Sequence, residues 1–233
     1  MAKLRNSKPR NPSGGFNRLF NDDALGGLMS KVQSTVIANG SELENLITAR
    51  APAVEDLDRA LEDPSSCEPG TYLVPKKQMK KSNICRIQTI DISGERVKLP
   101  EPDFLILQIG DGRNRCDVVE LKDGHVFDTK KSQAEKDGLV EYAQKLGTKI
   151  PYSTDHHICC FNQEDPKEIQ KGLKNGFQPE EILTGRQFRE KLNLDYEEIQ
   201  ICREEDARDN TDFFFEELAK LPITERYFRK KED

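Results

Sequence analysis

The sequence predicts a mixed α/β fold in which a central mixed sheet is flanked by helices. Two short apolar runs, 104–109 and 116–121, have the length of strands and are joined by a turn that contains glycine. Apolar residues recur three or four positions apart over 22–61 and again over 132–146, which is typical of helices packed on a core. Another apolar run, 157–161, follows the second helical stretch, so strands and helices alternate as in α/β proteins.

The segments around these runs complete the expected order of elements. Gly40 interrupts the first helical stretch and Ser41 restarts it, so helices with a break between them are expected there. A loop at 64–70 precedes a partly alternating strand at 85–92. Residues from 166 onward are mostly helical in their pattern.

The chain is expected to form a flexible arm followed by one domain. Residues 1–20 carry five basic residues and no acid, so they are interpreted either as a disordered tail or as an arm that contacts DNA. Residues 21–233 are expected to form a single domain, with its core at about 83–162 and a helical C-terminal region.

The distribution of charge says more than the net charge of −6. A net negative chain does not coat nucleic acid indiscriminately, because non-specific affinity comes from neutralising phosphates. Basic residues nevertheless gather in the first 18 positions, at 76–81 and at 130–131, while acids dominate 179–219. A chain with this polarity can hold DNA on one face.

Hydropathy and cysteine usage point to the cytoplasm. No apolar run approaches the roughly 20 residues that cross a bilayer, and no signal-peptide pattern begins the sequence. The six cysteines are scattered without a paired framework, as expected of reduced thiols. We therefore expect a cytoplasmic protein with no membrane partner.

Three charged residues on the predicted hairpin are the candidate catalytic set. Asp103 opens the first strand and Glu120 lies near the end of the second, so both carboxylates are expected at one edge of the sheet. Lys122 follows Glu120 at a spacing of two and therefore projects from the same face. Carboxylates suit Mg²⁺, which activates water and polarises a phosphate, and a lysine stabilises the growing negative charge.

This segment resembles the PD-(D/E)XK signature of type II restriction endonucleases. The resemblance is carried by Pro102-Asp103 and by the run Glu120-Leu121-Lys122-Asp123-Gly124, and it is close over about 100–145. It implies a restriction-endonuclease-like fold in a prokaryotic enzyme that cuts double-stranded DNA with Mg²⁺. It also implies that Asp103 and Glu120 bind the metal, that Lys122 acts at the attacking water, and that Glu44 on an early helix joins them.

The same resemblance implies partners. Type II recognition sites are usually palindromic, so a two-fold symmetric homodimer is expected. A cognate DNA methyltransferase is expected as the genetic partner. Two alternatives stay open at this point: a structure-selective DNA repair or recombination nuclease of the same fold, and a non-catalytic DNA-binding protein whose charged residues form salt bridges at the strand ends.

Two assignments within the site have rivals. Ser41 to Glu44 also has the pattern of a capping box, in which Glu44 would reach back to a backbone N–H instead of binding metal. Asp117 competes with Glu120, but its odd spacing from Lys122 should turn it to the opposite face.

The run 156–160 contains adjacent His and Cys residues, whose alternation in a strand argues against a closed zinc site.

Several polar residues are candidates for contacts with DNA. Arginine reads guanine and Asn or Gln reads adenine, while lysine contacts phosphates. The candidates are Lys76, Lys77, Lys80, Lys81, Arg113, Asn114, Arg115, Lys130, Lys131 and Gln133.

Overall fold

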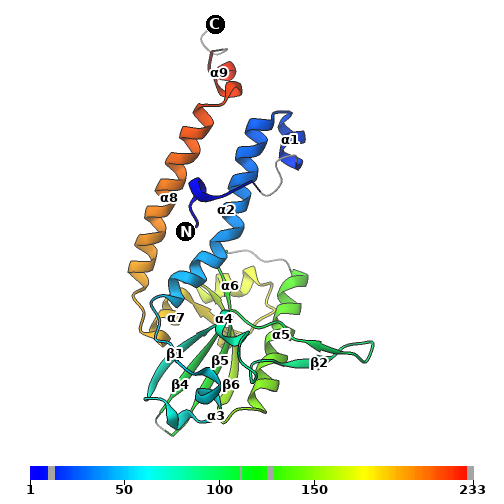
Figure 1. The fold of residues 1–233 in the computed structure, drawn as a ribbon, viewed down its shortest axis with the longest axis vertical. Coiled ribbons are helices and arrows are strands. Elements are labelled where there is room, and N and C mark those ends of the chain that lie inside the picture. Colours follow the sequence, from blue (N-terminus) through cyan, green and yellow to red (C-terminus); the bar gives the residue numbers. More distant parts are fainter. Residues whose placement is uncertain (10–13, 111, 125–128, 230–233) are drawn as a thin grey trace. The chain divides into compact units, whose positions relative to one another are not determined.

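The computed structural model describes residues 1–9, 14–110, 112–124 and 129–229, and it confirms the mixed α/β class (Figure 1). The chain divides into two compact units, which are described separately below. A sheet unit comprises Ile47–Tyr196, and a helical unit comprises Met1–Leu46 with Glu197–Asp233. That residues 21–233 act as one domain stays a prediction.

The sheet unit is built on five strands in the order β1-β4-β5-β6-β7. Antiparallel pairing joins β1 to β4 and β4 to β5, whereas β5, β6 and β7 run parallel, so the sheet is mixed. The predicted hairpin is therefore confirmed as β4 and β5. The bounds are β1 Gly70–Pro75, β4 Phe104–Ile109, β5 Arg115–Lys122, β6 Ser153–Cys160 and β7 Ile182–Thr184.

Helix α5, which spans Thr129–Gly147, confirms the helix predicted over 132–146, and it links the parallel strands β5 and β6. Its apolar residues Leu139, Tyr142 and Leu146 are buried in one core with Val118 of β5 and Ile158 of β6. The remaining helical segments of this unit are α3 Leu57–Glu62, η2 Pro64–Ser66, α4 Lys76–Met79, α6 Pro166–Gly172, η3 Pro179–Glu181 and α7 Gly185–Leu192.

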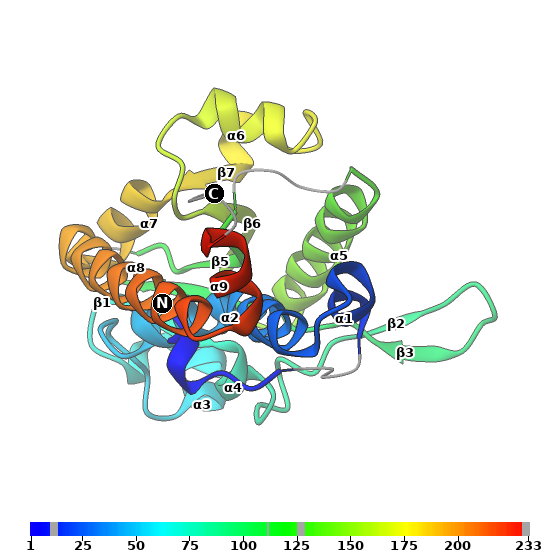
Figure 2. The same cartoon turned by 90° about the horizontal axis from the view of Figure 1, so that it is seen from above.

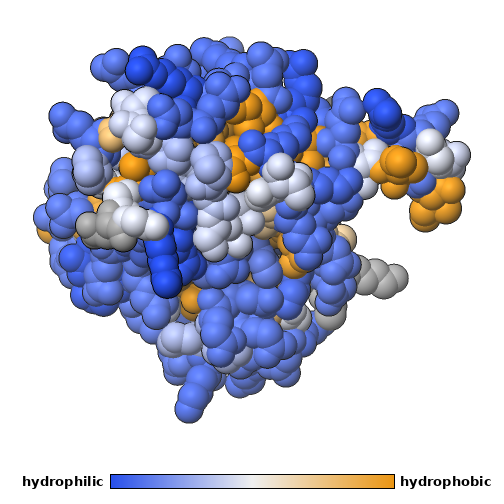
Figure 3. Space-filling view, turned by 90° about the horizontal axis from the view of Figure 1, so that it is seen from below, coloured by the Kyte–Doolittle hydropathy of each residue, from blue (hydrophilic) through white to orange (hydrophobic). Residues whose placement is uncertain are grey.

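A two-stranded ribbon projects from the sheet unit (Figure 2). It pairs β2, Gln88–Ile90, with β3, Arg96–Lys98, so the strand predicted at 85–92 is shorter than expected and lies outside the main sheet. Apolar side chains are exposed on the projecting part of the surface (Figure 3). The exposed apolar residues of the ribbon are Ile90, Ile92 and Val97.

The helical unit contains a 26-residue helix, α2, that runs unbroken over Asp23–Thr48. The break predicted at Gly40 is therefore wrong, and the capping box from Ser41 to Glu44 does not form, because both residues lie inside the helix. One interior glycine costs only about 1 kcal/mol relative to alanine, which a helix of this length can absorb. The other elements are η1 Leu4–Asn6, α1 Gly15–Phe20, α8 Tyr196–Ala219 and α9 Pro222–Arg229.

The start of the chain lies against α2 and α8 within the helical unit. The backbone N–H of Ala2 donates to Asn39 Oδ1 at 2.9 Å, and that of Leu4 donates to Asn210 Oδ1 at 2.6 Å. Arg5 pairs with Asp209 on the acidic helix α8. The sequence suggested a flexible arm here. In the described part of that arm, basic residues pair with aspartates of α8.

Among the described residues, no helix combines the length and apolar character required to cross a membrane.

Candidate active site

The strand register brings Asp103 opposite Glu120. Phe104, the first residue of β4, pairs with Val119 in the antiparallel ladder, so Asp103 just before β4 faces Glu120 on β5. Asp103 is buried, and its Oδ2 accepts a hydrogen bond of 3.0 Å from the backbone N–H of Leu121. This bond fixes the Asp103 carboxylate to the strand that carries Glu120 and Lys122.

Lys122 lies between two carboxylates. Its Nζ is 3.0 Å from Oε1 of Glu120, two residues earlier on the same face of β5, and 2.9 Å from Oε1 of Glu135 on α5. The predicted set is thus brought together, and it faces the side of the sheet that α5 covers. The contact with Glu135 was not predicted, because nothing local in the sequence pairs a strand lysine with a helix glutamate.

Lys76 is a second lysine at this edge of the sheet. Pro75 pairs with Phe104 between β1 and β4, so the next residue, Lys76, lies beside Asp103. The Lys76 Nζ is 3.2 Å from Asp103 Oδ1, and the Lys76 backbone N–H donates to the Asp103 carbonyl oxygen at 3.0 Å. Lys76 was predicted to contact DNA, but its link to Asp103 was not predicted, because strand β1 was not predicted.

A cavity of about 310 Å³ opens beside these groups. Its charged lining comes from β5, α5, the start of α4 and the segment before β4, and it includes the carboxylates of Glu120 and Glu135. The polar and charged residues that line it are Lys76, Glu101, Glu120, Glu135 and Tyr142. Glu101, Glu135 and Tyr142 were not predicted as site residues; Glu101 is buried and pairs with Lys98.

The close approach of the carboxylates and lysines in this partly buried site determines their pKa values. Burial, and then the nearby Asp103 carboxylate, raise the pKa of Glu120 to about 7. Burial alone would lower the pKa of Lys122, but the carboxylates of Glu120 and Glu135 outweigh it and raise that pKa above its ordinary value. Lys122 therefore carries its positive charge at neutral pH.

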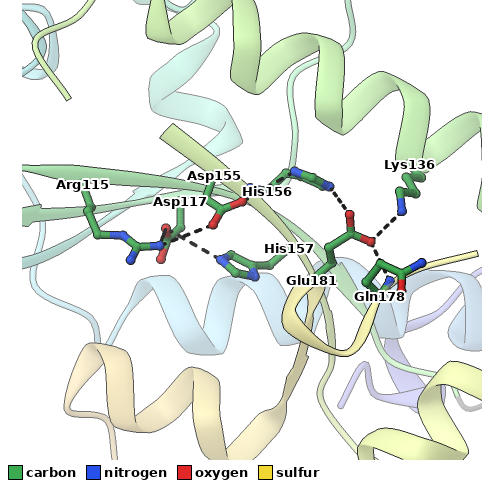
Figure 4. Close-up of polar contacts among 8 residues, drawn as sticks. All are labelled: Arg115, Asp117, Lys136, Asp155, His156, His157, Gln178 and Glu181. Atoms are coloured by element: carbon green, nitrogen blue, oxygen red, sulfur yellow. Dashed lines mark hydrogen bonds and ion pairs between the residues drawn. The ribbon is translucent and has the colours of Figure 1, made fainter. Parts of the chain in front are cut away.

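Asp117 lies on the other face of β5, as its spacing predicts. It is 0% exposed and contacts Lys191 of α7, whose Nζ lies 2.9 Å from Asp117 Oδ2. His157 Nε2 lies 3.7 Å and Arg115 Nη2 3.4 Å from Asp117 Oδ1 (Figure 4). Asp117 was the alternative to Glu120 as a metal ligand. Its contacts with Lys191, His157 and Arg115 instead make it part of a buried ionic cluster.

His156 and His157 contact different carboxylates, as alternation along β6 requires (Figure 4). His156 Nε2 is 3.1 Å from Glu181 Oε1, and Lys136 of α5 is 2.6 Å from the other oxygen of Glu181. Glu181 also accepts a hydrogen bond from the backbone N–H of Gln178. This network ties α5 to the segment before β7.

The structure separates several predicted DNA contacts from the site. Residues 113–115 lie at the opposite end of the β4–β5 hairpin from Asp103, about 20 Å away for a strand of this length. Arg115 pairs there with Asp117 and Asp155. Lys77, Lys80 and Lys81 are exposed on or just after α4, the helix that Lys76 begins. These DNA contacts stay predictions.

Four further predicted residues have separate outcomes. Gln133 is exposed on α5, and its Nε2 donates to Asp137 Oδ1 at 2.8 Å. The side chains of Lys130 and Lys131 lie outside the described part of the chain. Glu44 lies on α2 in the helical unit, and its part in metal binding stays a prediction.

The Asp117 cluster predicts an acid-sensitive contribution to stability. Although burial opposes ionisation, His157 and Lys191 hold the pKa of Asp117 well below its ordinary value of 3.8. A carboxyl whose pKa is lowered in the folded state stabilises the fold at pH values above its ordinary pKa. That stabilisation is lost as the pH falls below the ordinary pKa toward the lowered one. We expect Asp117→Asn to flatten the decline of unfolding free energy from about pH 5 to 2, measured by urea denaturation. An unchanged pH slope would contradict this.

Comparison with known proteins assigns the family. The chain is similar over its full length to a type II restriction enzyme, with 41% identity over 234 residues that cover 99% of both chains. It therefore belongs to the type II restriction enzymes, which are site-specific deoxyribonucleases. That relative is the type II restriction enzyme HhaII of Haemophilus parahaemolyticus. No protein-family model matches the chain, and no solved structure matches it.

Proposed function

We propose that the chain cuts both strands of duplex DNA by Mg²⁺-assisted hydrolysis at a PD-(D/E)XK site formed by Asp103, Glu120 and Lys122. The single observation that carries this proposal is the convergence of the three side chains at one sheet edge. Asp103 faces Glu120 in the strand register, and Lys122 contacts Glu120 on the same face. Metal-assisted hydrolysis of a phosphodiester can use such a pair of carboxylates with a cationic side chain beside them.

The donor set fits Mg²⁺, the ion that restriction enzymes typically require. Mg²⁺ keeps several waters and needs only one or two protein carboxylates together with substrate phosphate oxygens. Asp103 and Glu120 supply that number, and among the described residues no larger group of His, Cys, Asp and Glu could hold an ion. The raised pKa of Glu120 reflects two carboxylates sharing a buried space, which a bound cation would relieve. When bound, the ion polarises the phosphate and activates water.

The residues of the chain have distinct parts in the proposed reaction. The N–H of Leu121 and the ammonium of Lys76 orient the Asp103 carboxylate. Lys122 is positively charged, so it acts by donating hydrogen bonds to the water and phosphate oxygens and by stabilising the charge that develops there. The contacts with Glu120 and Glu135 fit this electrostatic role, because they hold the ammonium beside the proposed metal ligand.

The proposed partners follow from the reaction. Duplex DNA with a palindromic site implies a homodimer in which each subunit cuts one strand. The exposed lysines Lys77, Lys80 and Lys81 follow directly on Lys76, so they are placed to contact phosphates that flank the cut. A DNA methyltransferase that protects the same site is the expected genetic partner.

The experiment that tests the proposed function is digestion of unmethylated phage DNA by the purified protein with Mg²⁺ or with EDTA. We expect discrete fragments with Mg²⁺ and intact DNA with EDTA. End-mapping of the fragments then gives the recognition sequence. Discrete fragments in EDTA would overturn the metal-dependent mechanism, and a continuous smear in Mg²⁺ would contradict sequence-specific cutting.

The pKa of Glu120 predicts how metal binding depends on pH. A proton competes with the ion for this carboxylate, so affinity for Mg²⁺ should rise as the pH rises through about 7. One proton with that pKa makes binding roughly tenfold weaker one pH unit below it than at the alkaline plateau. Isothermal titration with Mg²⁺ alone measures this, and Glu120→Gln should abolish the pH dependence. A wild-type affinity that is constant across this range would contradict the assignment.

A further inference from the structure

Lys122 has a second carboxylate partner outside the proposed motif. Glu135 lies 13 residues after Lys122, on the helix that follows β5, and its Oε1 is 2.9 Å from the lysine Nζ. The Lys122 side chain is 18% exposed and that of Glu135 is 34% exposed. The pair is thus partly shielded from solvent, where an ion pair orients its members better than it does on an open surface.

Helix α5 gives Glu135 a fixed position relative to the sheet. Glu135 lies one helical turn before Leu139, which is buried against the core, so both residues face the sheet. The neighbouring Lys136 is held by Glu181 at 2.6 Å. Packing on one side and an ion pair on the other therefore fix the part of α5 that presents Glu135.

The two carboxylates that contact Lys122, those of Glu120 and Glu135, differ in their other interactions. Under the proposed function, Glu120 is a metal ligand, so its carboxylate must serve both the ion and the lysine. Glu135 contacts Lys122 from α5 and is not part of the Asp103–Glu120 pair. Because a lysine side chain has a flexible four-carbon stem, its ammonium needs such an anchor to stay in one place during the reaction.

We propose that Glu135 is a positioning residue that holds the Lys122 ammonium in its catalytic place. This inference rests on the role proposed above for Lys122. It assigns to α5 a part in catalysis that the motif does not include. The lysine is oriented from the helix side while Glu120 serves the metal.

The test compares Glu135→Ala and Glu135→Gln with wild type in single-turnover cleavage of a duplex that carries the mapped site. Loss of a residue that orients a catalytic group typically costs about 10-fold to 100-fold. We expect the alanine variant to show a loss of this size in the cleavage rate. Glutamine keeps an acceptor oxygen at the same reach, so it should recover part of the rate. Affinity for the duplex in Ca²⁺ should stay unchanged.

Glu141→Ala is the matched control. Glu141 lies on the same helix, its side chain is 38% exposed, and it also pairs with a lysine, Lys145, at 3.1 Å. It lies outside the cavity lining, so its loss should leave the cleavage rate near wild type.

The outcomes separate this inference from the proposed function. Wild-type rates in both Glu135 variants, with Lys122→Ala inactive, would overturn the positioning role and leave the proposed site intact. Full activity of Lys122→Ala would overturn the site itself. A weaker affinity of Glu135→Ala for Mg²⁺ alone, measured by calorimetry, would also overturn the inference, because Glu135 would then act as a metal ligand.

Discussion

Replacing Asp103 by Asn is expected to stop DNA cleavage while the protein stays folded. Asparagine has the same size and keeps an oxygen that can accept the Leu121 N–H, but it removes the negative charge that faces Lys76 and the proposed metal. Metal-ion catalysis supplies several kcal/mol of transition-state stabilisation, and its loss corresponds to a rate reduction of about 10³-fold or more. Single-turnover cleavage in saturating Mg²⁺ measures the effect.

Asp117→Asn is the control for this variant. Both aspartates are buried and belong to the same pair of strands, but Asp117 contacts Lys191 and His157 on the other face of the sheet. Removing one partner of a buried pair costs about 3–5 kcal/mol, and the partial exposure of Lys191 favours the lower end. We expect lower stability with cleavage retained at a temperature where the variant is folded. Inactivity of Asp117→Asn and activity of Asp103→Asn would reverse the assignment.

Replacing Lys122 by Met is expected to lower the cleavage rate by about 10²- to 10³-fold, the typical effect of losing one preorganised donor to a developing charge. Methionine keeps the apolar stem but removes the ammonium that contacts Glu120 and Glu135. Calorimetry should show that Mg²⁺ still binds, which distinguishes this variant from Asp103→Asn.

Lys145→Met is the control for the lysine substitution. Lys145 pairs with a glutamate on α5 and donates to the Gln88 carbonyl oxygen, away from the cavity lining. Cleavage by this variant should match wild type. A rate for Lys122→Met within about twofold of wild type would contradict the electrostatic role, since the loss of one such donor costs far more.

The hairpin that forms the site could be predicted from the sequence because its signals are local. Alternation along a strand decides which residues share a face, so Glu120 and Lys122 were separated correctly from Asp117. Facing positions across a short turn are also set by the chain itself, which brought Asp103 to Glu120. The helix that follows was visible in its apolar spacing.

Strand β1 was missed because Pro69, Gly70 and Pro75 have the composition of a loop. Proline is compatible with an edge strand, which leaves one row of backbone groups unpaired. Without β1, the position of Lys76 beside Asp103 could not be foreseen. Glu135 was missed for a related reason, since a contact between a strand and a distant helix turn depends on tertiary packing.

Helix α2 shows the opposite error, in which a local signal was given too much weight. Gly40 suggested a break, but it lies within a continuous helix. The arginines of the hairpin turn are close in sequence to Glu120, yet a strand separates them from it in space. Nearness along the chain does not decide which end of a sheet a residue occupies.

The two faces of β5 have consequences for insertions and deletions. Its eight residues carry the Asp117 cluster on one side and the proposed cleavage residues Glu120 and Lys122 on the other. Adding one residue near the middle of the strand would exchange the faces of every side chain beyond it. Glu120 and Lys122 would then point toward the face covered by α7. We therefore expect a single-codon insertion in this strand to inactivate the enzyme. A change of length at a loop tip of the same unit would leave Glu120 and Lys122 on their present face.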